Sequence, residues 1–255
     1  AVVCNFDGAT TGTVNALKAQ GAFYYVILGR YGDGKTRILF ELNKLLKQPG
    51  FVEGKVIASF IKALPPRPPT KYFAQYLLPQ IIQGIGLKTF KQLRDDLEKM
   101  VIGRKELEEH LNKLNPDFYN AFLAIGGNNE RIAWRWFLGE TLTQAQRRSI
   151  HVISNIRTDE IAERMFLELL KLLWILGYNA LILLIDEFEY ITIHKGKSII
   201  FLETFRKLYD TINEAISQLK EIASLIAVFA STPAGWDRIL PFHEQGITPF
   251  LDRVP

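Results

Sequence analysis

The segment Gly29-Arg30-Tyr31-Gly32-Asp33-Gly34-Lys35-Thr36 has the full spacing G-x-x-x-x-G-K-(S/T). It directly follows the apolar run AFYYVIL at residues 22–28, whose aromatic and β-branched side chains predict a strand buried on both faces. It directly precedes residues 35–47, where leucine and isoleucine recur at helical spacing until Gln48-Pro49-Gly50 ends the pattern. A glycine-rich turn between a buried strand and a helix start directs consecutive backbone N–H groups at one point, the geometry that binds a phosphate.

The residue types in this loop fit that chemistry. Gly29, Gly32 and Gly34 permit bends and a close approach to phosphate that a Cβ atom would obstruct. Lys35 supplies a mobile cation for the outer phosphates, and the Thr36 hydroxyl is a ligand for Mg²⁺. The alternative is a glycine-rich turn without a ligand. The predicted nucleotide-binding set is Gly29, Arg30, Tyr31, Gly32, Asp33, Gly34, Lys35 and Thr36.

The rest of the chain alternates short apolar runs with helical patterns, which predicts an α/β fold. Further strands are expected at residues 55–60, 180–185 and 225–230, and further helices at 158–177 and 198–219. Buried strands separated by helices are typical of a mainly parallel sheet covered on both faces. Together with the glycine-rich motif at residues 29–36, this predicts the three-layer core of a P-loop NTPase. We expect residues 1–255 to form a single domain of this kind.

Residues 61–157 form a predicted helical insertion in that core. They open with the proline-rich stretch 64–70, which predicts a stiff extended connector. Helical patterns follow near residues 71–83, 87–100, 105–114 and 116–124. About 120 residues lie between the second and third strands, too many for one crossover connection, which is why we predict an insertion.

A second chemical signal is ALILLIDE at residues 180–187, an apolar strand that ends in two carboxylates. Acidic side chains on a buried parallel strand are favourable only at its carboxyl end, where open α/β sheets bind ligands. Asp186 is the predicted second protein ligand of Mg²⁺, acting through the metal's water shell, and Glu187 the group that deprotonates the attacking water. Strand-end capping or a solvated charge is the alternative, and Glu189 is equally well explained as a solvated or ion-paired group.

A third signal is the end of the last strand, where residues 225–230 lead into Ser231-Thr232-Pro233. In ATPases with an additional strand, a polar residue at this place senses the γ-phosphate. We nominate Thr232, with Ser231 as the second choice. The alternative is an ordinary strand-to-turn transition, for which these residue types are common.

The sequence also bears on which nucleotide is bound and in which compartment the protein works. No N-K-x-D sequence is present to read guanine, so ATP is favoured. With 48% hydrophobic and 23% charged residues the chain is neither disordered nor fibrous, and its single cysteine, Cys4, indicates a reducing, cytoplasmic setting without disulfides. The net charge of +4 is too small to argue for nucleic acid.

Residues 165–185 are largely apolar and raise the possibility of a membrane span. Glu168 and Lys171 interrupt the run and Gly177 breaks it, so we predict helix, turn and strand, and no membrane association. Thr158 is the expected N-cap of the helix, and Glu168 is expected on its narrow polar stripe.

These motifs together resemble the ATP-binding domain of the BREX phage-resistance systems, a branch of the AAA+ ATPases related to origin-recognition ATPases. The residues 29–36 fit that family. The other matching features are FLGE at 137–140, Arg147-Arg148, Gly177-Tyr178, LLIDEFE at 183–189, FASTP at 229–233, Trp236 and LDR at 251–253.

The resemblance implies an AAA+-like core with an additional strand between the strand before the loop and the strand that ends in Asp186. It implies an ATPase that acts as a homo-oligomer or with partner ATPase subunits, with DNA a possible partner. Arg253 falls where such proteins place an arginine finger, and Arg238 is the second choice; either is also explained as a surface arginine. Because the chain stops at Pro255, the family's helical lid is expected to be absent from it.

Two functions stay open at this point. The first is Mg²⁺-dependent ATP hydrolysis that drives or switches a DNA-associated phage-defence assembly, with Lys35, Glu187, Thr232 and Arg253 as catalytic residues. The second is a slow-turnover, ATP-dependent switch of the signalling or initiator type that controls partner or DNA binding. A vestigial site is disfavoured because Lys35, Asp186 and Glu187 are all present.

Overall fold

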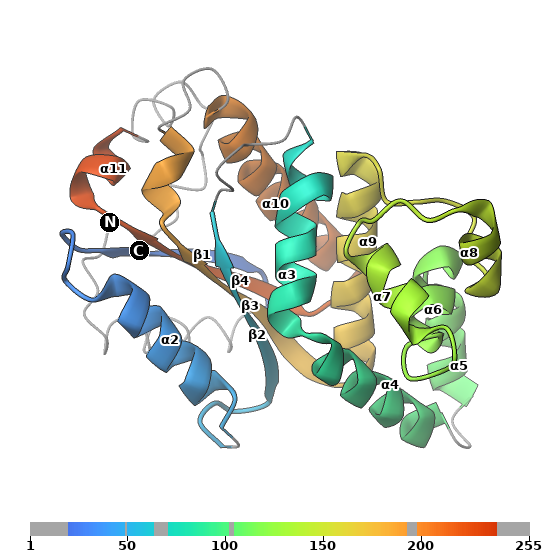
Figure 1. Cartoon of the computed structure of the whole chain (residues 1–255). Helices are drawn as coiled ribbons and strands as arrows, with labels where there is room; N and C mark the ends of the chain where they lie inside the picture. Colours follow the sequence, from blue (N-terminus) through green and yellow to red (C-terminus); the bar gives the residue numbers. More distant parts are fainter. Residues whose placement is uncertain (1–19, 49, 64–70, 102–104, 193–197, 239–255) are drawn as a thin grey trace.

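A parallel four-stranded sheet organises the part of the chain that the computed structural model describes, residues 20–48, 50–63, 71–101, 105–192 and 198–238 (Figure 1). The strands pair in the order β1-β4-β3-β2. Their bounds are β1 (Ala22–Leu28), β2 (Lys55–Lys62), β3 (Tyr178–Asp186) and β4 (Ser224–Ser231). All four predicted strands are confirmed, and β4 separates the strand before the loop from the strand that ends in Asp186.

The central strands are buried on both faces, as their unbroken apolar runs predict. Every residue of β4 is buried. Alternate side chains of β3 enter different cores, since Ile182 and Leu184 pack in the cluster that contains Leu39 and Leu42 of α2, and Leu183 packs in the larger cluster on the other face. The parallel pairing brings the carboxyl ends of β1, β4 and β3 to one edge of the sheet.

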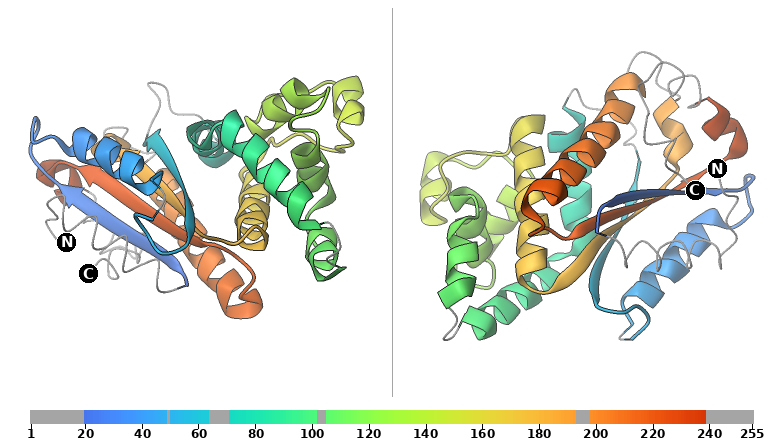
Figure 2. Two further views of the ribbon diagram at one scale, coloured as in Figure 1. Left: turned by 90° about the horizontal axis from the view of Figure 1, so that it is seen from below. Right: turned by 180° about the vertical axis from the view of Figure 1, so that it is seen from behind.

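Helices cover both faces of this sheet. Helix α2 (Lys35–Leu46) lies on one face, while α3, α9 and α10 lie on the other (Figures 1 and 2). Helices α4 to α8 form a group beside α9, on the side away from α2 (Figure 2). The remaining bounds are η1 (Phe73–Leu77), α3 (Leu78–Ile85), α4 (Leu87–Val101), α5 (Lys105–Asn112), α6 (Pro116–Leu123), α7 (Glu130–Phe137), α8 (Gln144–Ser149), α9 (Asp159–Ile175), η2 (Phe188–Thr192), α10 (Ser198–Leu219) and α11 (Pro233–Asp237).

The helices predicted for residues 71–124 are therefore present. The proline-rich connector 64–70 and Cys4 lie outside the described residues. That residues 61–157 are an insertion in a single domain stays a prediction.

Helix α9 begins as predicted, with the Thr158 hydroxyl accepting a hydrogen bond from the N–H of Ile161. Its polar stripe was predicted wrongly at Glu168, which is only 5% exposed. The Glu168 carboxylate accepts a hydrogen bond from the Asn115 N–H at 2.8 Å and pairs with Lys171 at 2.9 Å. It is therefore satisfied internally and ties α9 to the residue that caps α6. Across the described residues, no helix combines the length and the apolar character that a bilayer crossing requires.

Replacing Glu168 with alanine is expected to lower the free energy of unfolding by about 1–3 kcal/mol. The substitution leaves the partly buried Asn115 N–H without this acceptor and Lys171 without its partner. Glu168→Gln keeps an acceptor for that N–H and is expected to cost less. Urea unfolding of both variants measures the difference, and equal stability of the alanine variant and the unmodified protein would show that this contact stabilises nothing.

Candidate functional site

The loop at residues 29–34 has the backbone conformation that its glycines predict. Gly32 and Gly34 adopt left-handed φ angles of 91° and 82°, where an L side chain is strained. Gly34 is the N-cap of α2 and its carbonyl accepts the first helical hydrogen bond, from Ile38. Because the N-cap has no side chain, it does not compete for the N–H groups at the start of α2, which suits them to an anion.

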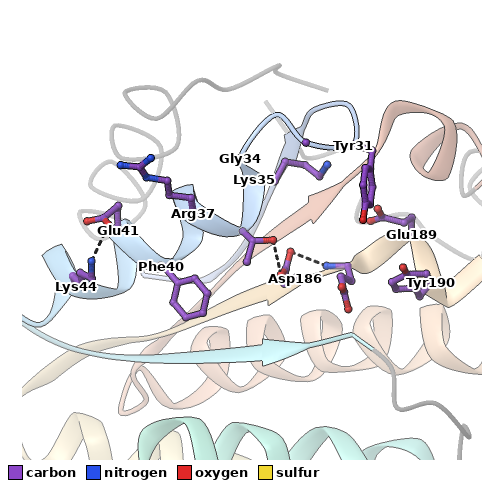
Figure 3. A pocket seen from close by; sticks show the side chains of 13 residues that line it. Tyr31, Gly34, Lys35, Arg37, Phe40, Glu41, Lys44, Asp186, Glu189 and Tyr190 are labelled. Atoms are coloured by element: carbon purple, nitrogen blue, oxygen red, sulfur yellow. Dashed lines mark hydrogen bonds and ion pairs between the residues drawn. The ribbon is translucent and has the colours of Figure 1, made fainter.

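Lys35 is folded back over this loop. Its Nζ atom donates hydrogen bonds to the carbonyls of Gly29 at 2.8 Å and Arg30 at 3.0 Å. Figure 3 shows the side chain lying along the loop toward Tyr31. Both partners are neutral, so among the described residues no carboxylate neutralises this cation in an ion pair. Its charge is available to an anion bound at the loop.

The two predicted metal ligands meet in the structure. The Thr36 hydroxyl donates a hydrogen bond of 2.9 Å to Asp186 Oδ2, although the two residues are 150 positions apart in the sequence. Asp186 is only 4% exposed, and its Oδ1 atom accepts the N–H of Glu187 at 3.0 Å (Figure 3). No Lys, Arg or His of the described ranges forms an ion pair with it. A buried carboxylate without a cation is costly, so the Thr36 hydroxyl and the Asp186 carboxylate together fit a divalent cation.

The donor set is also the right kind for magnesium. The described part of the chain has no group of three or more His, Cys, Asp or Glu residues that could hold a metal ion. Thr36 and Asp186 offer hard oxygen ligands, and Mg²⁺ is characteristically held by one or two protein oxygens together with water and substrate phosphates. The residues thus fit Mg²⁺ bound together with a phosphate group.

Glu187 is held in an unusual conformation beside this pair. Its φ angle is 56°, in the left-handed region that residues other than glycine seldom adopt. Its carboxylate forms an ion pair of 3.2 Å with Lys62 at the end of β2, and both side chains are partly exposed. Sequence reasoning missed Lys62; the signal was a lysine that follows the apolar run of β2 in a strand neighbouring β3.

Tyr76 is a second neighbour of Glu187 that the sequence did not predict. It lies in η1, a single stretch of π-helix, a form that occurs frequently at functional sites. Burial raises the pKa of the Tyr76 hydroxyl to about 12, with a further contribution from the negative charge of Glu187. The phenol is therefore neutral at physiological pH and lies within electrostatic range of Glu187.

A cleft of about 780 Å³ connects the glycine-rich loop with Thr36, Asp186 and Glu187, whereas Lys62 and Tyr76 lie outside its lining. Tyr31, whose side chain is almost fully exposed, lies at one end, with Glu41 and Lys44 at the other (Figure 3). Phe40 lies between them and stacks on Phe60 with ring centroids 4.4 Å apart. Helical spacing on α2 explains why Phe40 lies on the same side as Thr36, four residues before it. The lining residues are Tyr31, Gly32, Gly34, Lys35, Thr36, Arg37, Phe40, Glu41, Lys44, Asp186, Glu187, Glu189 and Tyr190.

Thr232 lies outside this lining. Its hydroxyl accepts a hydrogen bond of 3.1 Å from the Gly235 N–H and so caps α11. The neighbouring Ser231 is fully buried, and its carbonyl accepts the N–H of Gly29 at 3.2 Å, which joins β4 to the start of the loop. The sensor role of Thr232 stays a prediction, and the helix cap is the contact that its hydroxyl makes here. Arg238 is exposed, and Arg253 lies outside the described residues.

The strand order, the glycine-rich loop and the carboxylate at the end of β3 are compatible with a P-loop NTPase core. A family model described as BREX system ATP-binding protein BrxC/D matches residues 88–240. The match covers more than half of the chain, and the chain therefore belongs to this family, a family of ATP-binding proteins. No curated protein and no solved structure matches it.

The family match covers only one of the two parts of the site, the strand ends and not the glycine-rich loop. It includes β3 and β4, with Asp186, Glu187 and Thr232, whereas the loop at residues 29–36 precedes it. The match begins at residue 88, within the helices of the predicted insertion and well before the matching feature at residues 137–140. The helical group is thus part of what defines the family, together with the acidic end of β3.

The cap at Thr232 gives a stability test. Thr232→Ala removes the acceptor for the Gly235 N–H and is expected to lower the free energy of unfolding by about 1 kcal/mol. Thr232→Ser keeps an acceptor and is expected to lose much less. Denaturant unfolding without nucleotide compares the two, and an alanine variant as stable as the serine variant would contradict a capping role.

Proposed function

We propose that this protein binds ATP with Mg²⁺ and hydrolyses it. The single observation that carries the proposal is the hydrogen bond between Thr36 and Asp186, which joins the end of the glycine-rich loop to the acidic end of β3. A loop suited to phosphate, a buried carboxylate suited to a divalent cation and a second carboxylate beside it share one cleft. This set of groups is what phosphoryl transfer to water requires.

The residues divide the work as follows in this proposal. Backbone N–H groups of the loop and of the start of α2, other than those of Arg30 and Asp33, which are bonded within the loop, hold the phosphates together with the Lys35 cation. Thr36 and Asp186 hold Mg²⁺, which when bound neutralises the charge that develops on the phosphate oxygens. Glu187 accepts a proton from a water molecule as that water's oxygen bonds to the γ-phosphorus, and the bond from phosphorus to the bridging oxygen of ADP breaks.

The ion pair between Lys62 and Glu187 bears on the rate. A lysine that pairs with the carboxylate stabilises its charged form and competes for its oxygens, so we infer that the pair lowers basal turnover by a small factor. The second candidate function, a slow-turnover ATP-dependent switch that controls the binding of a partner, stays open beside hydrolysis. Wild-type turnover with Mg²⁺, compared with the effect of ATP on partner binding, distinguishes the two functions.

The family supports a wider setting for this activity. Because the family is named for the BREX system, we propose that the ATP cycle drives or switches a DNA-associated phage-defence assembly. In this proposal the protein acts as a homo-oligomer or together with partner ATPase subunits. Arg253, or Arg238 in its place, contributes a cation to the nucleotide site of the neighbouring subunit. Thr232 as the γ-phosphate sensor belongs to the same proposal.

The base assignment is tested by Glu187→Gln. The variant is expected to bind Mg-ATP like the unmodified protein and to hydrolyse it about 10²–10⁴-fold more slowly, because the amide cannot accept the proton. Phosphate release and the dissociation constant of Mg-ATP are measured in parallel. Glu203→Gln, an exposed glutamate on α10, is the matched control. Unchanged turnover in Glu187→Gln would remove the base from the mechanism.

The role of Lys62 is tested by Lys62→Met. An exposed ion pair is worth about 0.2–1 kcal/mol, so freeing Glu187 is expected to raise the basal turnover about 1.5- to 5-fold without altering the affinity for Mg-ATP. Lys55→Met, at the opposite end of β2, controls for the loss of a lysine from the same strand. A large fall in turnover in Lys62→Met would instead make Lys62 part of the hydrolytic machinery.

A further inference from the structure

The loop that carries Lys35 contains a hydrogen-bonded ring of its own. The Asp33 carboxylate accepts the N–H of Arg30 at 2.6 Å, and the Asp33 N–H donates to the Arg30 carbonyl at 3.2 Å. The two residues therefore satisfy each other across the turn. The Arg30 carbonyl also accepts a hydrogen bond from Lys35 Nζ at 3.0 Å, so the Asp33 N–H and the Lys35 side chain share this one acceptor.

Gly29 allows this arrangement. A Cβ atom at Gly29 would lie 3.2 Å from Cγ of Lys35 and 3.3 Å from Cβ of Asp33, so both side chains pass close over its backbone. A methyl group there would force one of the two to shift. The close approach is independent evidence that Asp33 and Lys35 are packed together on the loop.

The Asp33 carboxylate is not directed at the phosphate position. Asp33 and Arg30 are absent from the lining of the cleft, whereas their neighbours Tyr31, Gly32, Gly34 and Lys35 line it. A carboxylate bonded to the loop N–H groups that line the cleft would compete with a phosphate for them. Placed on the Arg30 N–H instead, it braces the turn from outside the binding surface.

We propose that Asp33 is a positioning residue that holds the loop in its phosphate-binding conformation before any nucleotide arrives. This inference rests on the proposed function and adds to it how the affinity of the site is set. A glycine-rich loop is costly to order, because glycine loses more conformational freedom than any other residue. A loop ordered in advance bears that cost in folding rather than in binding, so Asp33 acts on the affinity for nucleotide.

A pair of variants tests this inference through the hydrogen bond alone. Asp33→Asn removes the charge but keeps a carbonyl oxygen that accepts the Arg30 N–H, whereas Asp33→Ala removes the acceptor. The dissociation constant of Mg-ATP is expected to be about tenfold higher for Asp33→Ala than for Asp33→Asn. Asp33→Ala is also expected to raise KM by a larger factor than it lowers kcat. Equal affinities of the two variants would overturn the inference.

Amide hydrogen exchange without nucleotide provides the second measurement. Exchange across residues 30–34 is expected to be faster in Asp33→Ala than in Asp33→Asn, and Mg-ATP is expected to reduce this difference. Equal exchange in the two nucleotide-free variants would also overturn the inference. If the unmodified protein takes up no Mg-ATP, the proposed function fails, while exchange in the nucleotide-free variants still decides whether Asp33 braces the loop.

Discussion

The buried carboxylate of Asp186 is the constraint around which the site is built. It is almost inaccessible to water, and within the described residues it has hydrogen-bond donors but no cation. Such a group is favourable only when a positive charge is brought to it. The strand order supplies the place, because β4 separates β1 from β3 and leaves the loop after β1 to extend across to Asp186. In our proposal phosphate binding and metal binding are thereby linked in one cleft.

The helical side of the molecule reaches the same cleft through Glu187. Lys62 ends β2 and pairs with Glu187. Tyr76 lies in the π-helix η1, where the charge of Glu187 contributes to the raised pKa of its hydroxyl. Glu168 connects α9 to the helix group through the Asn115 N–H. Helix α9 directly precedes β3 in the sequence. The groups around Glu187 therefore come from the end of a strand and from the helical side of the molecule.

Much of the fold could be predicted from the sequence because buried parallel strands are unbroken apolar runs bounded by glycine or charge. The bounds of β1 and α10 and the cap at Thr158 agree with the predictions. The spacing G-x-x-x-x-G-K-(S/T) likewise located the loop. Its meeting with Asp186 followed from the rule that ligands bind at the carboxyl ends of the strands.

The contacts that the sequence did not reveal depend on packing between distant segments. The burial of Glu168 depends on where α6 begins, which no periodicity within α9 encodes. The approach of Lys62 and Tyr76 to Glu187 depends on how the chain turns between β2 and η1. From the sequence, Thr232 could be a γ-phosphate sensor or an ordinary strand-to-turn residue. Its hydroxyl caps α11, a five-residue helix that the sequence analysis did not predict.

The central claim is that Asp186 and the loop bind one Mg-ATP between them. Calorimetric titration of ATP with and without Mg²⁺, into the unmodified protein and into Asp186→Asn, tests it most directly. Asparagine keeps an oxygen for the Thr36 hydroxyl but has no charge for the metal. The account predicts saturable ATP binding that Mg²⁺ strengthens in the unmodified protein, and loss of that strengthening in the variant. No binding at all, or an equal effect of Mg²⁺ on both proteins, would contradict it.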